Sequence, residues 1–514
     1  MRSPSYVKAA LATTLAVVLF AATLRRYVWL PSYSKVALAT TLNIVLNALT
    51  LERYVWLEGR VSGGVFTNWA KRFPYRPRRF VRPTTEEEIV ELVGSSRSLR
   101  VFGSGHSFNN GVVSDETLVS LDDYSGLIWQ DLRKKQIAVK GGTRVRDVVK
   151  LLSDAGLAFK ALPSHDAQSI AGILSTDVHG TGKIFGSEEE NWGFVSQSVV
   201  GLKLIDGRGE VHECRPSDDL FKAAIGGIGA VGIITEVVVQ GVPRFNVEQK
   251  VQTQDVSFVE KNLDRLLKDN EHLSLYLFPF ANKCQINTWN SKEKDRTIPG
   301  RFRELIELSK GSLLEFASIS KDALTAAWVG NFIAYIGHLP CSRFVYSFKP
   351  GSNLLLESNK GFNRTIYHLH QELEFTVPFE DTFEACKRFI RLYEDLYNEL
   401  YPSGLPYALF EVRFTPDKHD RTLIGAGRER RCTWIDLVCN DSHGFEKYYA
   451  EAQKLIKEIG ARPHLGKYCE AFGRADLAKL HGENFTRFLD LVEEHDPDGK
   501  FANEFTRRLF EGRA

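Results

Sequence analysis

The stretch Arg100–Asn110, RVFGSGHSFNN, contains the end of a short apolar strand, a glycine-rich turn and a histidine within that turn. Gly103 and Gly105 allow the backbone to bend sharply and to approach a bound group closely. The serines and asparagines around them are small polar residues that suit a turn. Because no large side chain fills the turn, the stretch predicts either a ligand-facing loop built around His106 or a surface turn with an incidental histidine.

The composition is that of a globular protein with more than one domain. A chain of 514 residues is too long for a single core. The net charge of +2 and the lack of a lysine–arginine stripe in the sequence argue against a nucleic-acid partner. The 7 cysteines are scattered and form no CxxC pair. Neither a zinc site nor a dense disulfide framework is therefore expected, and no metal-binding residue is predicted.

The N-terminal segment contains two similar copies of one apolar sequence, 4–30 and 31–57. Each copy has an uncharged run, Ala9 to Leu24 and Val36 to Leu51, with a Tyr-Val-Trp sequence shortly after it. A full membrane span needs about 20 apolar residues, which is more than either run offers, but Tyr and Trp are common at membrane interfaces. Residues 1–60 are interpreted as a membrane anchor or hairpin, which predicts a membrane-associated protein. A targeting peptide and soluble helices are the alternatives.

Residues 66–245 alternate short strands and helices, which predicts an α+β unit. Thr85 followed by three glutamates indicates the start of a helix. The stretch 164–182 is dense in Gly, Ser and Thr but also carries an apolar core. That composition suits a backbone that meets phosphates through N–H and hydroxyl groups. A flexible loop is the alternative for this stretch.

The hexapeptide Gly227–Gly232 matches the GxGxxG pattern of nicotinamide-dinucleotide sites. That fingerprint requires a strand before the glycines and a helix after them. Here a helical pattern, 220–225, comes first and a β-rich run, 233–239, follows. Because the order is reversed, a Rossmann-type nicotinamide site is not expected.

A second unit is predicted over residues 246–490, and it carries charged residues in an apolar strand. In the stretch 408–414 hydrophobic and other residues alternate, so a strand would place Glu411 and Arg413 on one face. One interpretation is an ion pair exposed at a sheet surface, which would contribute little to stability. The other is a pair that faces a substrate.

Four segments, in this order and approximate spacing, resemble the FAD-binding domain of the vanillyl-alcohol-oxidase superfamily: Gly103–Ser107, Ser169–Gly172, His179–Gly182 and Gly229–Thr235. The chain is similar to the branch that contains the sugar-1,4-lactone oxidases and the alditol oxidases, from about residue 66 to the C-terminus. The resemblance implies an α+β flavoprotein with a bipartite, PCMH-type FAD-binding domain and an α+β substrate domain that caps the flavin. It also implies a closing segment, 491–514, that returns to the FAD domain.

The resemblance implies roles for individual residues. His106 matches the family histidine that is joined covalently to the flavin 8α-methyl group. The other residues implied to bind FAD are Phe102, Gly103, Ser104, Gly105, Ser107, Ser169, Gly172, Thr176, His179, Ile233 and Ile234. The residues implied to form the substrate site are Glu411, Arg413, His464 and Lys467.

Two positions depart from the family pattern. Leu465 follows the histidine where relatives usually carry Trp. Asp436 and Val438 stand where the alditol oxidases carry a His-x-Thr pair, and this departure favours a lactone over an alditol.

The implied reaction is oxidation of a secondary alcohol of a sugar-1,4-lactone, such as arabinono- or gulono-1,4-lactone, as in ascorbate-type biosynthesis. Hydride would pass to flavin N5, with oxygen as the acceptor. Glu411 would hold substrate hydroxyls, and Arg413 and Lys467 would offset negative charge on the reduced flavin. Glu411, His464 and Lys467 are all candidates for the proton acceptor. The alternatives are an alditol or polyol oxidase, a membrane-linked dehydrogenase with a quinone or cytochrome acceptor, and a flavin-free binding module.

Overall fold

The computed structural model describes residues 60–114, 116–184, 192–280, 282–292, 352–362, 370–400, 408–417, 419–440 and 444–512. The duplicated apolar segment predicted to be a membrane anchor lies outside these residues. Within them, no helix is both long enough and apolar enough to cross a membrane. Six of the cysteines fall in the described residues, and all six are buried free thiols.

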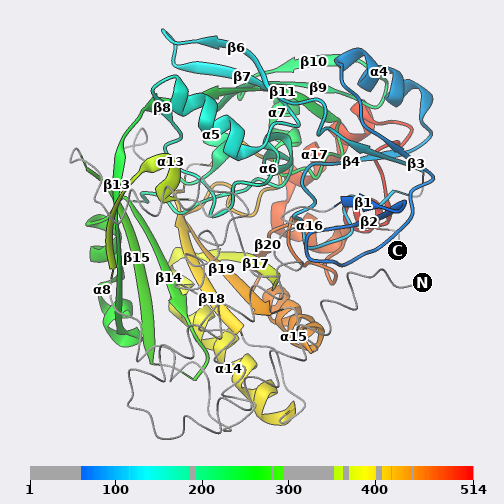
Figure 1. The fold of residues 1–514 in the computed structure, drawn as a ribbon. Coiled ribbons are helices and arrows are strands. Elements are labelled where there is room, and N and C mark those ends of the chain that lie inside the picture. Colours follow the sequence, from blue (N-terminus) through cyan, green and yellow to red (C-terminus); the bar gives the residue numbers. More distant parts are fainter. Residues whose placement is uncertain are drawn as a thin grey trace, which may run out of the picture.

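The glycine turn directly follows a strand of a small parallel sheet, which lies at one end of the molecule (Figure 1). Its strands lie in the order β3 (Arg79–Val81), β5 (Thr117–Ser120) and β4 (Leu99–Phe102). Between β3 and β4 runs helix α4 (Glu86–Ser95), whose start is the one predicted, because the Thr85 side chain accepts a hydrogen bond from the backbone N–H of Glu88. Strand β4 therefore delivers Gly103 to the interior of the protein. A hairpin of β1 (Arg60–Ser62) and β2 (Val65–Thr67) lies nearby.

An antiparallel five-stranded sheet stands beside it. Its order is β10 (Val211–Cys214), β9 (Val199–Ile205), β11 (Ile233–Gln240), β7 (Gln136–Lys140) and β6 (Leu127–Asp131). The helices of this part are α5 (Val145–Asp154), α6 (Ile170–Ser175) and α7 (Asp219–Ala224), and β8 (Leu157–Ala158) pairs with β12 (Val242–Pro243). Helix α7 precedes the GxGxxG glycines and β11 follows them, which is the reverse of a Rossmann site. That part of the prediction is confirmed.

An eight-stranded antiparallel sheet forms the second half of the molecule. Its order is β16 (Ser352–Glu357), β13 (Asn246–Asp255), β15 (Lys283–Lys292), β14 (His272–Leu277), β18 (Ala408–Thr415), β19 (Cys432–Asn440), β17 (His370–Pro378) and β20 (Arg462–Pro463). Its helices are α8 (Val256–Lys268), α13 (Ser358–Gly361), α14 (Thr382–Leu400) and α15 (Phe445–Glu458). Figure 1 shows α8, α14 and α15 against the large sheet.

The two faces of the large sheet differ in chemistry because its strands alternate apolar and polar residues. On the apolar face, Phe375 of β17 packs on Phe389 of α14 with ring centroids 4.5 Å apart. Tyr449 of α15 donates from its hydroxyl to backbone carbonyls of β17 and β19. The polar face carries Glu374, Arg413 and their neighbours and points toward the glycine turn. The helices thus cover the apolar face of the large sheet, and the polar face is left toward the glycine turn.

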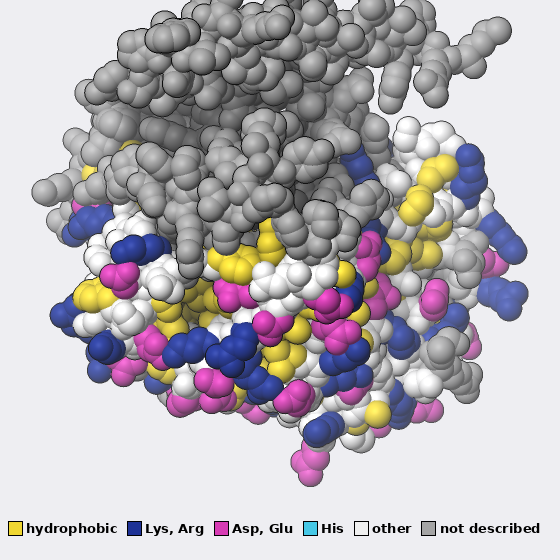
Figure 2. Space-filling model, turned by 90° about the horizontal axis from the view of Figure 1, so that it is seen from below, with side chains coloured by type: hydrophobic (Ala, Val, Ile, Leu, Met, Phe, Trp, Pro, Cys, Tyr) yellow, Lys and Arg dark blue, Asp and Glu magenta, His cyan; other side chains and the backbone are white. Residues whose placement is uncertain are grey.

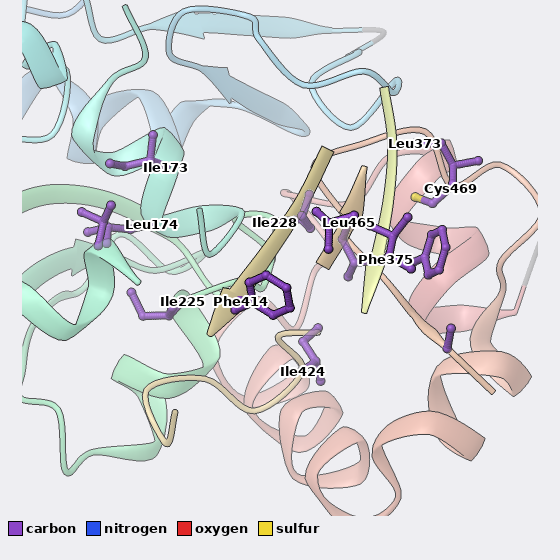
Figure 3. Packing of buried hydrophobic residues seen from close by; sticks show 14 of the residues in the cluster. Ile173, Leu174, Ile225, Ile228, Leu373, Phe375, Phe414, Ile424, Leu465 and Cys469 are labelled. Atoms are coloured by element: carbon purple, nitrogen blue, oxygen red, sulfur yellow. The ribbon is translucent and has the colours of Figure 1, made fainter. Parts of the chain in front are cut away.

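One continuous core joins the two halves. Buried residues of α6, such as Ile173 and Leu174, belong to the same cluster as Phe375 and Phe414 of the large sheet (Figure 3). The C-terminal helices α16 (Arg474–His481), α17 (Glu483–His495) and α18 (Glu504–Thr506) add further residues to this cluster, as does a π-helical turn over Arg507–Glu511. On the face seen in Figure 2, basic and acidic side chains are intermixed over the described surface.

The C-terminal segment packs against the strand that bears the glycine turn. The Lys500 carbonyl accepts a hydrogen bond from the backbone N–H of Leu99. The buried Arg100 side chain donates to the carbonyl oxygens of Gly111, Ile228 and Phe501. Contacts more than 400 residues apart in sequence thus hold β4 in place, so the position of the turn depends on the completed fold.

Candidate active site

A cavity lies between the glycine turn and the polar face of the large sheet. Every residue predicted to bind FAD lines it. Arg413, His464 and Lys467 line it as well. The lining also includes aromatic and charged residues that were not among the predicted site residues, such as Trp69, His165, His370, Glu372 and Glu374. The structure therefore brings the two predicted sets together around one space.

The glycine turn approaches helix α6 too closely for any side chain. A Cβ atom at Gly103 would lie 1.9 Å from Oγ of Ser169. Gly105 has φ +66°, the left-handed region that favours glycine. Ser169 in turn caps α6 by accepting from the backbone N–H of Gly172 at 3.3 Å. The interpretation of 164–182 as a flexible loop is therefore wrong, because the serine begins a helix whose apolar residues are buried.

The turn offers hydrogen-bond donors to whatever occupies the cavity. The backbone N–H groups of Ser104, Gly105 and Ser107 have no acceptor within the described residues. Ser104 is nevertheless buried, and a buried N–H group requires an acceptor. Phosphate and flavin carbonyl oxygens would supply such acceptors. The donor set of the turn thus fits FAD.

Aromatic rings surround His106. The Trp69 ring is stacked near the imidazole at 5.3 Å and an interplanar angle of 24°. The ring of His165 lies 4.2 Å away on centroids. Burial, followed by the proximity of His106, holds the pKa of His165 well below its ordinary value, so His165 is neutral. A second histidine therefore stands close enough to His106 to be an alternative attachment point for a cofactor.

Three carboxyl groups surround the guanidinium of Arg413. Pairing of β18 with β19 and of β19 with β17 puts Glu411 opposite Asp436 and Asp436 opposite Glu374. The Arg413 nitrogens lie 3.5 Å from Glu374, 3.4 Å from Glu411 and 3.5 Å from Asp436. Arg413 is 8% exposed. The alternative of an exposed surface pair is therefore wrong.

Glu411 is the one predicted substrate residue that does not line the cavity. Its carboxylate contacts the Nε atom of Arg413, and its side chain is 16% exposed. The residue shares a face with Arg413, as its spacing predicted. In this structure Glu411 is in contact with the guanidinium and lies outside the cavity lining.

Lys467 forms the second cation of the cluster. Its Nζ contacts Glu372 and lies 3.8 Å from Glu374 and 3.6 Å from Asp436. Burial alone would lower the pKa of Lys467, but the carboxyl groups of Asp436, Glu372 and Glu374 outweigh it and raise the pKa. Lys467 is therefore a cation in the resting protein and has no capacity to accept a proton.

His464 is neutral, and its proton can be placed. Burial lowers the pKa of His464 to about 4. Its Nδ1 accepts a hydrogen bond from the backbone N–H of Gly466 at 3.0 Å, so the ring proton sits on Nε2. His464 thus is a lining residue whose Nε2–H is a hydrogen-bond donor. The turn that carries it is tied to the glycine turn, since Phe108 donates its backbone N–H to the Gly466 carbonyl.

His179 and Glu374 form a buried pair that spans the two halves of the cavity. Nε2 of His179 lies 3.1 Å from Glu374, and Nδ1 lies 2.8 Å from the Gly180 carbonyl oxygen. The two ring nitrogens thus face two oxygen atoms, one of the Glu374 carboxyl group and one of the Gly180 carbonyl group. The ring stacks on Trp434 at 3.7 Å. This packing fixes His179 in the cavity wall.

The buried carboxyl groups divide into two kinds. Burial, together with Glu372, holds the pKa of Asp436 well above its ordinary value. Burial also acts to raise the pKa of Glu372 and of Glu374, but nearby positive charges outweigh burial at both residues. For Glu372 the charges are Lys467 and His370, and for Glu374 they are His179, Lys467 and Arg413. The pKa values of both glutamates therefore lie below their ordinary values. Within this cluster the fold thus shifts the pKa of Asp436 upward and the pKa values of Glu372 and Glu374 downward.

The raised pKa of Asp436 predicts a pH-dependent difference between the wild type and Asp436→Asn. A group whose pKa is raised by folding stabilises the protein fully below its unfolded pKa, about 3.9. That stability is lost as pH rises through the folded pKa, at up to about 1.4 kcal/mol per pH unit. The isosteric amide does not titrate. The unfolding midpoint of the variant minus that of the wild type, measured in urea at a series of pH values from about 5 to 9, should therefore increase with pH. A difference that stays constant over this range would contradict the assignment.

Two of the missed residues could have been found from the sequence. Glu372 and Glu374 alternate with Leu373 and Phe375, which is the period of a strand with one polar face. The structure places this stretch in strand β17, which begins at His370. Trp69 and His165 carry no comparable signal, because their positions depend on contacts with distant segments.

The sequence matches two protein families and several known proteins. The D-arabinono-1,4-lactone oxidase family matches residues 237–509, and the FAD-binding domain family matches residues 77–215. L-gulono-1,4-lactone dehydrogenase of Mycobacterium tuberculosis is 26% identical over 450 residues, covering 87% of this chain and 99% of that protein. L-gulonolactone oxidase of Mus musculus is 25% identical over 462 residues, covering 87% of this chain and 99% of that protein.

A solved structure shares the fold. Cholesterol oxidase from Brevibacterium sterolicum superimposes with a TM-score of 0.68 at 14% identity, covering 87% of this chain and 96% of that chain. The architecture is thus the predicted PCMH-type flavoprotein fold of the α+β class. Because the lactone oxidase match extends over more than half of the 514 residues, the protein belongs to the D-arabinono-1,4-lactone oxidase family and is an FAD-dependent oxidoreductase.

Proposed function

We propose that the protein oxidises a secondary alcohol of a sugar-1,4-lactone, such as D-arabinono- or L-gulono-1,4-lactone, to the corresponding ketone. The observation that carries the proposal is the buried Arg413–Lys467 pair, which faces the cavity opposite the glycine turn. When bound there, FAD supplies the redox chemistry by accepting two electrons and one proton as hydride from the substrate carbon. The hydroxyl proton leaves to a base. Oxygen then takes the two electrons and two protons and becomes hydrogen peroxide.

The two cations provide fixed positive charge where negative charge develops. Arg413 and Lys467 line the cavity and are held in place by neighbouring carboxyl groups. Such a preorganised charge stabilises the transition state without reorganisation. Glu411 acts through Arg413, because its carboxylate orients the guanidinium at 3.4 Å. His464 adds a neutral Nε2–H donor toward the substrate.

The proton acceptor is a carboxylate on β17 in this proposal. Lys467 is a cation, His464 has its ring proton on Nε2, and Glu411 lies outside the cavity lining. Glu372 and Glu374 line the cavity and are ionised. A carboxylate with a depressed pKa is a weak base. For Glu372 or Glu374 to accept the proton, Lys467 must therefore move away from that carboxylate as the alcohol is oxidised, or the carboxylate and Lys467 must relay the proton together.

A covalent link between His106 and the flavin is the finer part of the proposal. The link would replace one hydrogen of the 8α-methyl group and the N–H hydrogen of His106 with a C–N bond. The two electrons and two protons released would pass to oxygen. The position of His106 in the cavity lining, stacked on Trp69, supports this assignment.

Turnover with a panel of substrates tests the proposed reaction. D-arabinono- and L-gulono-1,4-lactone should be oxidised with formation of hydrogen peroxide in air, and the alditols xylitol and sorbitol should be oxidised far more slowly. Relatives are named both oxidases and dehydrogenases, so the same assay under nitrogen with a quinone or cytochrome c identifies the acceptor. Faster turnover of the alditols would contradict the lactone assignment.

We also propose that the protein is membrane-associated through residues 1–57. The support is the pair of uncharged runs with Tyr and Trp nearby. Replacing Leu19 and Leu46 together with Asp should release the protein into the soluble fraction of a carbonate-washed membrane preparation. Retention of the double variant in the membrane fraction would contradict the proposal.

A further inference from the structure

A second group of ligand-type side chains lies at the turn of the β9–β10 hairpin, outside the cavity lining. Asp206 follows β9, His212 lies in β10, and His495 is the last residue of α17. Nε2 of His212 is 2.8 Å and Nδ1 of His495 is 3.4 Å from the same oxygen, Oδ2 of Asp206. The three potential ligand atoms all lie within 4.8 Å of one another. Two imidazoles and a carboxylate thus converge on one point.

The backbone holds this group in place. Oδ1 of Asp206 accepts hydrogen bonds from the backbone N–H groups of Arg208 and Glu210. Those bonds occupy one carboxylate oxygen and aim the other at the two imidazoles. The backbone N–H of Gly207 donates to the His495 carbonyl at 2.7 Å, so the end of α17 is fixed against the hairpin. The geometry does not depend on flexible side chains alone.

The arrangement leaves one direction open to solvent. The side chain of Asp206 is fully buried and that of His495 is 10% exposed, whereas that of His212 is 27% exposed. The two imidazole rings are nearly perpendicular, at 85°, with centroids 4.9 Å apart. The second imidazole nitrogen of His495 faces the Glu494 carboxylate at 3.9 Å, and metal-ligating histidines commonly have such a partner on their other nitrogen.

We propose that Asp206, His212 and His495 bind a divalent transition-metal ion of the zinc class, with water as the fourth ligand. Two imidazole nitrogens and one carboxylate oxygen are a common ligand set for Zn²⁺. Zinc–ligand bonds of about 2.0–2.1 Å place tetrahedral ligands roughly 3.3 Å apart, close to the two distances to Asp206. The bound ion ties α17, and with it the C-terminal segment, to the hairpin. No cysteine takes part, so a search of the cysteine pattern does not reveal this site.

The alternative is a hydrogen-bond network without metal, in which both imidazoles donate to Asp206. His212→Gln separates the two cases, because the glutamine amide still donates a hydrogen bond to Asp206 but is a poor ligand for zinc. Glu494→Gln serves as the matched control, since it changes the neighbouring residue and leaves all three ligands in place. None of these residues lines the cavity, so lactone oxidation is expected to continue in both variants.

The test uses the full chain with its flavin, without an affinity tag, after treatment with EDTA. Titration with Co²⁺ should produce the visible d–d absorption of a tetrahedral complex, seen as a difference spectrum, with one equivalent bound. Zn²⁺ should displace the Co²⁺ and raise the thermal unfolding midpoint by several degrees. Mg²⁺ should do neither. In His212→Gln the affinity should fall at least tenfold, and in Glu494→Gln it should change little.

Two results would overturn the proposal. One is the absence of stoichiometric Co²⁺ or Zn²⁺ binding to the wild type. The other is binding that is unchanged in His212→Gln, which would place the ion elsewhere. Either result establishes the group as a hydrogen-bond network. Because the readouts are metal binding and unfolding, they do not depend on the proposed lactone chemistry.

Discussion

Replacing Arg413 with alanine is expected to slow reduction of the flavin by lactone about 10²–10³-fold, the usual cost of removing one preorganised charge donor from an active site. The guanidinium supplies positive charge to the cavity lining, and its nitrogens lie 3.4–3.5 Å from the carboxyl groups of Glu374, Glu411 and Asp436. Anaerobic stopped-flow measurement of flavin absorbance after mixing with D-arabinono-1,4-lactone gives the rate directly. FAD retention should change far less than this rate.

Stability must be separated from chemistry in this experiment. Removal of Arg413 takes its ion-pair partner from Glu411 and one of two nearby cations from Glu374, which keeps Lys467. Breaking a buried pair costs about 3–5 kcal/mol. Arg413→Lys keeps the charge but not the planar fork, so it should fold better than the alanine variant and show an intermediate rate. Arg421→Ala is the control, because Arg421 is partly buried but does not line the cavity. Unchanged reduction kinetics in folded, flavin-loaded Arg413→Ala would remove Arg413 from the mechanism.

Substitution of His106 by alanine should abolish acid-stable attachment of the flavin. In the wild type the yellow colour should remain with the polypeptide after acid precipitation, whereas in His106→Ala it should move entirely to the supernatant. The variant is expected still to bind FAD without a covalent bond, since the N–H groups of the glycine turn and the Ser169 region are unchanged. Loss of the link should also lower the flavin potential and slow its reduction.

His165→Ala is the matched control for this result. His165 lies 4.2 Å from His106 on ring centroids and lines the same cavity, so it is the nearest alternative for attachment. Its alanine variant should keep acid-stable flavin. If His165→Ala releases the flavin and His106→Ala retains it, the link is on His165. If neither wild type nor variant retains flavin after acid, the cofactor is not covalently bound.

Local sequence pattern was sufficient to predict one wall of the site. The sequence predicted a sharp glycine turn at residues 103–105, and the structure shows why glycine is needed there: Gly103 lies against Ser169, and Gly105 has a positive φ angle. The Glu411-x-Arg413 alternation likewise follows from strand geometry. The reversed context of the Gly227–Gly232 motif correctly excluded a Rossmann site, because the helix and strand on either side are local features.

Residues that depend on pairing register could not be placed from the sequence. Glu411 and Arg413 share a face, but only the pairing of β18, β19 and β17 determines which of them reaches the cavity. The same register brings Glu374 beside Arg413 from a strand about 40 residues away in sequence. His165 reaches His106 through a loop, and Asp206 meets His495 across 289 residues of sequence.

The protonation states in the cavity were also beyond the sequence. His464, Lys467 and Glu411 were equally plausible proton acceptors when only their residue types were known. Burial makes His464 neutral, and surrounding carboxyl groups keep Lys467 charged. These effects come from the packing of distant segments around each group, which sets both desolvation and charge.

The central claim is that a lactone reduces a flavin held in this cavity. Mixing the oxidised protein with D-arabinono-1,4-lactone in the absence of oxygen tests it most directly. We expect the yellow flavin absorbance to disappear in a single turnover, with one ketone formed per flavin, and to return when oxygen is admitted. Flavin that stays oxidised with both D-arabinono- and L-gulono-1,4-lactone, in folded and flavin-loaded protein, would contradict the account.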